Sequence, residues 1–197
     1  MSKRAFRHIK SRAKGFTLVE LMVTGAILVI LLAIGVPQLR NFLDKQRVAA
    51  DLESLVSSFQ LARSEALKRS GTVSICAKTA ADTPACVNGT TTDWSNGWLV
   101  FIDYGSAGAG ANAFDSTVDT LLRAEGPIRS GSITLSIAKS PITFLATGFA
   151  SSAGTTFRVN PEATANSTNP HRRCMVVSIL GKVKFVDPAD VADDGCL

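Results

Sequence analysis

The hydrophobic positions of the chain fall into three successive patterns. Residues 16–36 form an almost uninterrupted apolar run. From residue 38 to residue 69, apolar side chains recur at intervals of three and four, which is the spacing of one face of a helix. The positions on that face are Leu52, Leu55, Val56, Phe59, Ala62, Ala66 and Leu67. Beyond residue 72, short apolar segments alternate with clusters of Gly, Ser, Asn and Pro, a pattern typical of β-strands and turns.

The two helical patterns adjoin and predict one long helix over residues 16–69. Pro37 lies between them, and a proline inside a helix kinks or locally opens it. Ser70 and Gly71 are a typical helix stop. Four charged residues near the end are expected on the solvent-facing side of the helix. They are Arg63, Glu65, Lys68 and Arg69.

The remainder of the chain predicts a mostly antiparallel β domain, residues 72–197, here called the head domain. The amphipathic helix of residues 38–71 would lie across it and cover its core. Trp94 and Trp98 flank a glycine turn and are expected as core anchors. The expected strands are 73–76, 97–103, 120–124, 133–137, 142–145, 155–159, 174–179 and 182–186. The fold class is therefore α+β.

The apolar run is long enough to cross a membrane. As a helix, its 21 residues would rise roughly 31 Å, about the thickness of a bilayer core. Residues 1–15 carry six bases and no acid, which by the positive-inside rule holds that end in the cytoplasm. No small-residue cleavage site of the secretory type follows the run, so the segment is expected to stay with the mature protein.

Glu20 is the one charged residue in this run. An unpaired acid in an apolar span costs on the order of 2–3 kcal/mol or more, which marks it as a candidate functional residue. The alternative is an acid near a helix start, where the helix dipole and the lipid headgroups stabilise it.

The segment around Glu20 favours a functional role. Residues 14–21, Lys-Gly-Phe-Thr-Leu-Val-Glu-Leu, resemble the processing site of type IV pilins and type II secretion pseudopilins. The resemblance implies that prepilin peptidase, a membrane aspartyl enzyme, cuts between Gly15 and Phe16 and methylates the new amino terminus. Residues 1–15 would then be a removed leader, and residues 16–37 an anchor and assembly helix in which Pro37 is a flexible point.

In such an assembly, Glu20 of one subunit can pair with the Phe16 amine of its neighbour. Each charge would relieve the desolvation of the other, and the pairing would set the axial register of the filament.

Further segments indicate which group of pilins and pseudopilins the chain resembles. Residues 62–66 (Ala-Arg-Ser-Glu-Ala), Cys76 and residues 94–103 (Trp-Ser-Asn-Gly-Trp-Leu-Val-Phe-Ile-Asp) resemble the GspH/FimT family of minor pilins and pseudopilins. Residues 121–123, and residues 142–144 together with Gly148, fit the same pattern. The resemblance implies a pilin-like fold and a minor pilin that contributes to the assembly or tip of a type IV pilus. The alternative is a GspH-type pseudopilin of a type II secretion system.

The same resemblance implies partners and a location. The chain would sit in the bacterial inner membrane with its head domain in the periplasm. It would then join other pilins or pseudopilins in a helical filament.

Four cysteines, all in the head domain, then lie in an oxidising compartment that permits disulfides. Three pairings are possible, and proximity in sequence favours Cys76–Cys86 and Cys174–Cys196. Their spacing does not resemble that of a zinc site. The loop bounded by Asp103, Asp115 and Asp119 lacks the spacing of a calcium loop. We therefore predict no metal and no cofactor, and no enzymatic motif points to catalysis.

Composition and charge bear on nucleic-acid binding. With 46% hydrophobic and 19% charged residues, the chain is neither disordered nor polytopic. Its net charge is +5, but residues 1–15 contribute +6 and the other residues −1. A DNA site must therefore depend on a local patch.

The candidate patch joins Arg172 and Arg173 to the segment Gly181-Lys-Val-Lys184. FimT-type minor pilins that bind double-stranded DNA in natural transformation carry a Gly-Arg-x-Arg motif near the carboxyl end, which this segment resembles. Lys182 and Lys184 keep the charge but not the bidentate phosphate contacts of arginine. Binding would depend on phosphates and not on base sequence. The alternative is that the lysines protect an exposed strand edge.

Overall fold

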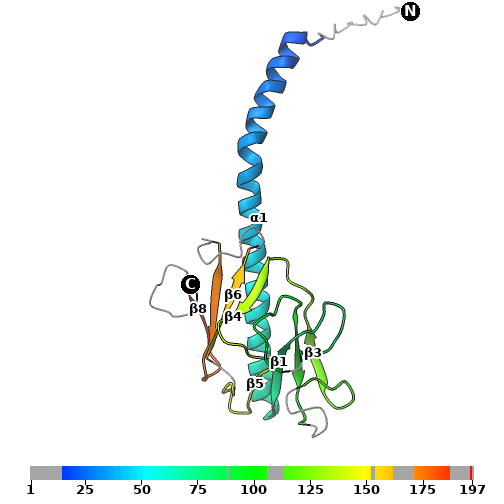
Figure 1. The fold of residues 1–197 in the computed structure, drawn as a ribbon, viewed down its shortest axis with the longest axis vertical. Helices are drawn as coiled ribbons and strands as arrows, with labels where there is room; N and C mark the ends of the chain where they lie inside the picture. Colours follow the sequence, from blue (N-terminus) through cyan, green and yellow to red (C-terminus); the bar gives the residue numbers. More distant parts are fainter. Residues whose placement is uncertain are drawn as a thin grey trace, which may run out of the picture. The chain divides into compact units, whose positions relative to one another are not determined.

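The computed structural model describes residues 15–87, 89–105, 113–151, 154–161, 171–186 and 196. The chain divides into two compact units, residues 1–41 and residues 42–197. One helix, α1 (Leu18–Arg69), contributes to both units. It is followed by eight strands in the described part of the chain (Figure 1). The long amino-terminal helix and the antiparallel sheets confirm the predicted α+β, pilin-like fold.

Thr17 sets the start of α1. Its hydroxyl accepts a hydrogen bond from the backbone N–H of Glu20 at 3.2 Å, and its carbonyl accepts one from Leu21, also at 3.2 Å. A threonine in this position is a typical N-cap, because its side chain satisfies a donor that the first turn leaves unpaired. The helix therefore begins at Leu18 and not at residue 16 as predicted. It continues through Pro37, so this proline does not end it.

The helix ends at Arg69, as the sequence predicts, but Ser70 and not Gly71 adopts the left-handed conformation that terminates it. Ser70 adopts a left-handed backbone with φ 50°, whereas Gly71 is not among the glycines with positive φ. The N–H of Ser70 bonds the carbonyl of Leu67 and that of Gly71 bonds the carbonyl of Ala66. This is the Schellman arrangement, in which glycine usually occupies the left-handed position. Ser70 therefore carries a backbone strain that glycine would not.

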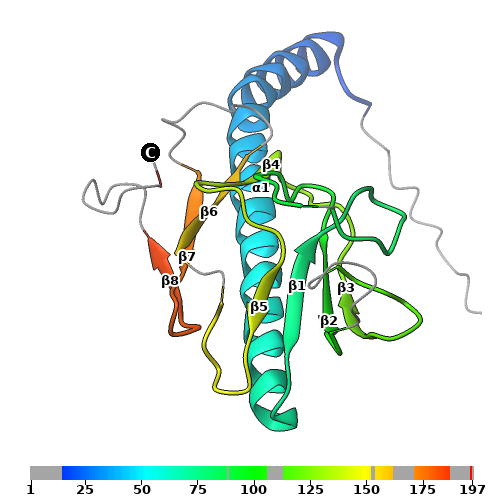
Figure 2. The same ribbon diagram turned by 60° about the horizontal axis from the view of Figure 1, so that its bottom comes forward.

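The strands form two antiparallel sheets, shown in Figure 2. The first sheet has the order β3-β2-β1-β5, with β1 (Val73–Ala77), β2 (Trp98–Ile102), β3 (Thr120–Ala124) and β5 (Ile142–Phe144). The second has the order β4-β6-β7-β8, with β4 (Ser132–Leu135), β6 (Thr155–Asn160), β7 (Arg173–Val177) and β8 (Val183–Val186). Each observed strand overlaps a predicted one, with ends that differ by no more than two residues.

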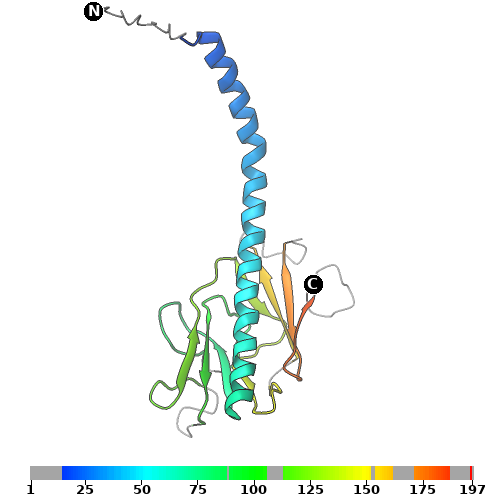
Figure 3. The same cartoon turned by 180° about the vertical axis from the view of Figure 1, so that it is seen from behind.

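Both sheets pack on the second-unit part of α1, as the view from behind shows (Figure 3). Phe59 is the centre of the core. Its ring lies 5.3 Å from that of Phe157, 6.1 Å from that of Phe144 and 6.5 Å from that of Trp94. Trp94 and Trp98 are buried, as predicted. Aromatic pairs at these distances add to the hydrophobic contribution of the buried area.

Two polar side chains on the buried face of α1 fix its position. Asp51 is buried and accepts hydrogen bonds from the backbone N–H groups of Arg129, at 3.0 Å, and Ser130, at 2.6 Å. The hydroxyl of Ser58 accepts a bond from Nε1 of Trp98 at 2.9 Å. Because buried polar groups are costly when unpaired, these bonds specify how the helix sits on the strands.

The predicted faces of α1 need two corrections. Leu67, placed on the buried stripe, is 48% exposed because the helix is ending there. Arg63, predicted to face solvent with its charged neighbours, is only partly exposed, and its Nε is buried. Lys68 and Arg69 are exposed as predicted, and Glu65 pairs with Arg69 at 2.6 Å and with Lys68 at 3.7 Å.

The strain at Ser70 predicts a stabilising mutation. Ser70→Gly should raise the free energy of unfolding by about 0.5–1 kcal/mol, because glycine adopts the left-handed conformation without steric cost. The control Ser64→Gly, at an exposed position inside the same helix, should instead lower it by about 0.5 kcal/mol. Urea titration of the chain in neutral detergent, followed by the fluorescence of the buried tryptophans, measures both. Destabilisation by Ser70→Gly would contradict the assignment.

Candidate functional site

The first candidate site is the segment that precedes α1. Gly15, Phe16 and Thr17 are exposed and lie outside the helix, and an added Cβ at Gly15 would meet no atom within 4 Å. The peptide bond between Gly15 and Phe16 is therefore accessible and not protected by helical hydrogen bonds. The basic residues of the predicted leader, up to residue 14, lie outside the described residues.

Glu20 lies in the first turn of α1, and its side chain is exposed, as are all residues from 15 to 43. Thr24, the next polar residue along the helix, donates its hydroxyl to the carbonyl of Leu21 at 3.1 Å. Such a bond satisfies a hydroxyl within its own helix, so Thr24 needs no external partner. Glu20 remains the one charge on the apolar surface of residues 16–36.

This surface has the length and composition of a membrane span. Among the described residues, α1 is the one helix that is long and apolar enough to cross a bilayer, and its most apolar window has no side chain buried within the protein. Large apolar side chains exposed along so many turns require a cover of lipid or of other helices.

The second candidate site is the turn from β7 to β8 and the strand β8 that follows. Gly181 has a left-handed backbone with φ 68°, and an added Cβ there would lie 2.2 Å from the carbonyl oxygen of Gly148. Only glycine fits this close approach of two turns. Lys182 follows this glycine and Lys184 lies within β8, and both are exposed.

The structure separates Arg172 from this patch, so the prediction that it contributes to a DNA-binding surface is wrong. Arg172 is 5% exposed. Its Nε donates to Oδ1 of Asn160 at 2.7 Å, and its Nη1 donates to the carbonyl oxygen of Cys196 at 3.0 Å. Burial lowers the pKa of Arg172, and the nearby positive charge of Arg158 lowers it further. The guanidinium thus serves to hold the chain near Cys196.

Arg173 is exposed, but strand alternation places it on the other face of the second sheet from Lys184. Val176 pairs with Lys184, and Cys174 pairs with both Val186 and Arg158. Directly paired residues share a face, so Lys184 and Arg158 lie on one side and Arg173 on the other. Arg158 was missed in the sequence because only the strand order β6-β7-β8 brings it near β8.

The four cysteines form two disulfides, both in the second unit. Cys76 is bonded to Cys86, with their Cα atoms 5.6 Å apart, and Cys174 to Cys196, at 5.8 Å. These are the pairings that proximity favours. The second bond attaches Cys196 to β7, beside the buried Arg172.

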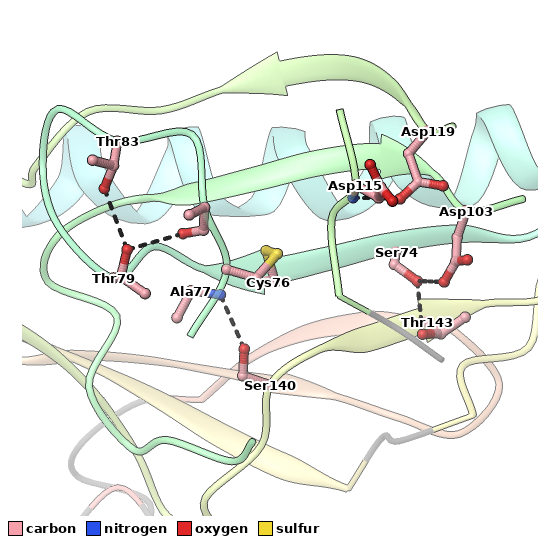
Figure 4. The surroundings of a disulfide bond; sticks show 12 residues. Ser74, Cys76, Ala77, Thr79, Thr83, Asp103, Asp115, Asp119, Ser140 and Thr143 are labelled. Atoms are coloured by element: carbon pink, nitrogen blue, oxygen red, sulfur yellow. Dashed lines mark hydrogen bonds between the residues drawn. A yellow bond between two sulfur atoms is a disulfide. The ribbon is translucent and has the colours of Figure 1, made fainter. Parts of the chain in front are cut away.

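The three acidic residues considered for calcium serve other roles around the first disulfide (Figure 4). Asp103 accepts a hydrogen bond from Ser74 at 3.1 Å, and Ser74 is also 2.8 Å from the hydroxyl of Thr143. Asp119 accepts bonds from the backbone N–H groups of Tyr104 and Asp115, and Asp115 accepts from the N–H and hydroxyl of Thr117. Within the described ranges, no group of three or more acidic, His or Cys side chains is placed to hold a metal ion.

Comparison with known proteins places the first candidate site in a matched region, whereas Lys182 and Lys184 of the second lie just beyond the residues matched. A family model described as "Type II transport protein GspH" matches residues 51–181, and one described as "Prokaryotic N-terminal methylation motif" matches residues 10–36. No curated protein matches the chain.

Two solved structures share the fold. Both are crystal structures of the type IV minor pilin FimU of Pseudomonas aeruginosa. One has a TM-score of 0.55 at 19% identity and covers 79% of this chain and 99% of its own. The other has a TM-score of 0.50 at 20% identity and covers 77% and 99%.

The exposed bond after Gly15 predicts the effect of one substitution. Gly15→Val should block cleavage, because a β-branched side chain replaces the smallest residue at the cut. An immunoblot against the second unit should then show a chain that keeps its 15-residue leader. The control Gly25→Val, also in open space within the apolar helix, should be processed normally. Normal mature protein from Gly15→Val would refute the cleavage site.

Proposed function

The chain belongs to the GspH family, the pilins and pseudopilins of the GspH/FimT type, and from this premise we propose that it is a minor pilin of a type IV pilus. Its contribution is to pilus assembly or to the pilus tip. The match to the methylation motif implies processing by prepilin peptidase and pilin or pseudopilin partners. The apolar part of α1 anchors the chain in the inner membrane before assembly.

The observation that carries this proposal is the exposed apolar surface of α1 with Glu20 as its single charge. In the membrane, lipid covers this surface. In a filament, neighbouring helices would cover roughly the same area, so the transfer costs little hydrophobic free energy. What changes is Glu20, which gains the Phe16 amine of a neighbouring subunit as a partner.

Glu20 would thus favour the filament over the membrane and fix the register between subunits. Removal of one member of a desolvated ion pair leaves the other charge unpaired, at a cost of about 3–5 kcal/mol. The likeness to a type IV minor pilin supports a pilus as the destination. The printed description of the family model supports the alternative, a GspH-type pseudopilin of a type II secretion system.

Deletion of the gene in the native bacterium separates these two machines. We expect loss or reduction of twitching motility and surface pili, with protein secretion unchanged. Complementation with Glu20→Gln should fail to restore pili although the leader is still removed. The control Glu53→Gln, which changes an exposed glutamate further along α1, should restore them. A secretion defect with normal pili would instead assign the chain to the type II system.

A second candidate function is DNA binding for natural transformation, which the exposed Lys182 and Lys184 favour. Both residues lie at the edge strand of the second sheet, and Arg158 shares the face of Lys184. Cations on one face of a strand can neutralise successive phosphates without reading bases. The alternative role of the same lysines is to keep an edge strand from pairing with another chain.

Titration of a labelled duplex with the full chain in neutral detergent, followed by fluorescence anisotropy, tests this second function. Lys182→Ala/Lys184→Ala should weaken binding and reduce the slope of log K against log salt by about 2, one unit for each lost phosphate contact. Lys45→Ala/Lys68→Ala removes the same charge elsewhere on the surface and should leave binding unchanged. If wild-type protein does not bind at low salt, the lysines protect the edge.

A further inference from the structure

A cavity of about 250 Å³ lies between α1 and the start of β8. One wall consists of Phe59, Gln60 and Arg63 from α1, and the other of residues 181–183. Gln60 and Arg63 are three residues apart, so their side chains leave the helix on the same face. Lys182 contributes a second cation from the opposite wall. No acidic side chain is among these lining residues.

Arg63, one of the lining residues, has a buried donor without a hydrogen-bond partner. Its Nε is buried and makes no hydrogen bond to the described part of the chain. Arg172, which is buried, in contrast bonds Asn160 and the carbonyl of Cys196. Buried donors nearly always have a partner, since an unpaired one costs about 1–3 kcal/mol and more when it is charged. Arg63 thus presents a charged donor that lacks an acceptor.

Two glycines hold the Arg63 side chain in place. An added Cβ would lie 3.4 Å from Nε of Arg63 at Gly148 and 3.3 Å from it at Gly181. The turns that contain these glycines therefore close on the guanidinium, and any larger residue would displace it. The side chain so held also lines the cavity, and no described acceptor bonds its Nε.

We propose that this cavity binds a phosphate group, with the guanidinium of Arg63 as the central donor. Lys182 supplies the second positive charge, and the amide of Gln60 can donate a third bond. Two cations balance inorganic phosphate up to the dianion and exceed the single charge of a phosphodiester, and charge-assisted bonds from a guanidinium to phosphate are among the strongest that proteins make. A phosphodiester of DNA is the expected source, and for that source the inference rests on the DNA-binding function proposed above.

Inorganic phosphate is the direct probe of the cavity. The 15N-labelled full chain in neutral detergent is titrated with phosphate at constant ionic strength, and the arginine Nε–H resonances are followed by NMR. We expect one resonance, identified by its absence in Arg63→Lys, to shift saturably. The phosphate-dependent rise in melting temperature should be lost in Arg63→Gln and kept in the matched control Lys68→Gln.

Two results would overturn the phosphate site. One is no saturable shift of the Arg63 resonance. The other is an equal shift with acetate, which would assign the cavity to a carboxylate, such as one from a neighbouring subunit. Far-ultraviolet circular dichroism of both Arg63 variants checks that they remain folded, and Arg63→Lys keeps the charge if Arg63→Gln does not fold.

The labelled duplex distinguishes the source of the phosphate. If DNA fills the cavity, Arg63→Gln should weaken duplex binding about tenfold, the expected loss for a charged hydrogen bond. A shift with inorganic phosphate but no duplex binding would retain the cavity and overturn DNA as its ligand. Duplex binding that needs Lys182 and Lys184, with no phosphate shift and no effect of Arg63→Gln, would overturn the cavity and retain the DNA-binding function.

Discussion

The structure of the second unit depends on the burial of one face of α1 against two sheets. Phe59 contacts aromatic rings from both, with Phe144 in the first sheet and Phe157 in the second. Neither four-stranded sheet could bury its apolar face without the helix, and the apolar stripe of the helix has no other cover within the second unit.

Asp51 and Ser58 then fix the helix by hydrogen bonds that only one placement satisfies. The position of β8, and hence of Lys182 beside Arg63, follows from this packing.

The same helix supplies two surfaces with opposite requirements. In the second unit its apolar residues are buried by the protein itself. In the first unit the apolar residues are exposed and need a cover from outside the chain, which lipid or the helices of other pilins can provide. Glu20 is the single acid on that surface. It makes burial among pilin helices energetically different from burial in lipid, because only a protein neighbour can offer it a fixed positive partner.

Much of the fold could be predicted from the sequence because it depends on local patterns. The alternation of apolar and turn residues located the strands, and the helical periodicity located the buried stripe from Leu52 to Ala66.

Features that depend on tertiary contacts could not be predicted. The burial of Arg172 requires Asn160 and Cys196 to be near it, and the shared face of Arg158 and Lys184 requires the strand order. Arg63 has the sequence context of a solvent-facing residue, and two glycine turns distant in sequence lie against its buried Nε.

The central claim is that the chain is processed and enters a filament. Its most direct test is mass spectrometry of the amino-terminal peptide from pili sheared off the native bacterium. We expect this fraction to contain the chain with an N-methylated Phe16 as its first residue. A chain that retains residues 1–15, or that is found in the membrane fraction and never in the sheared filaments, would contradict the account.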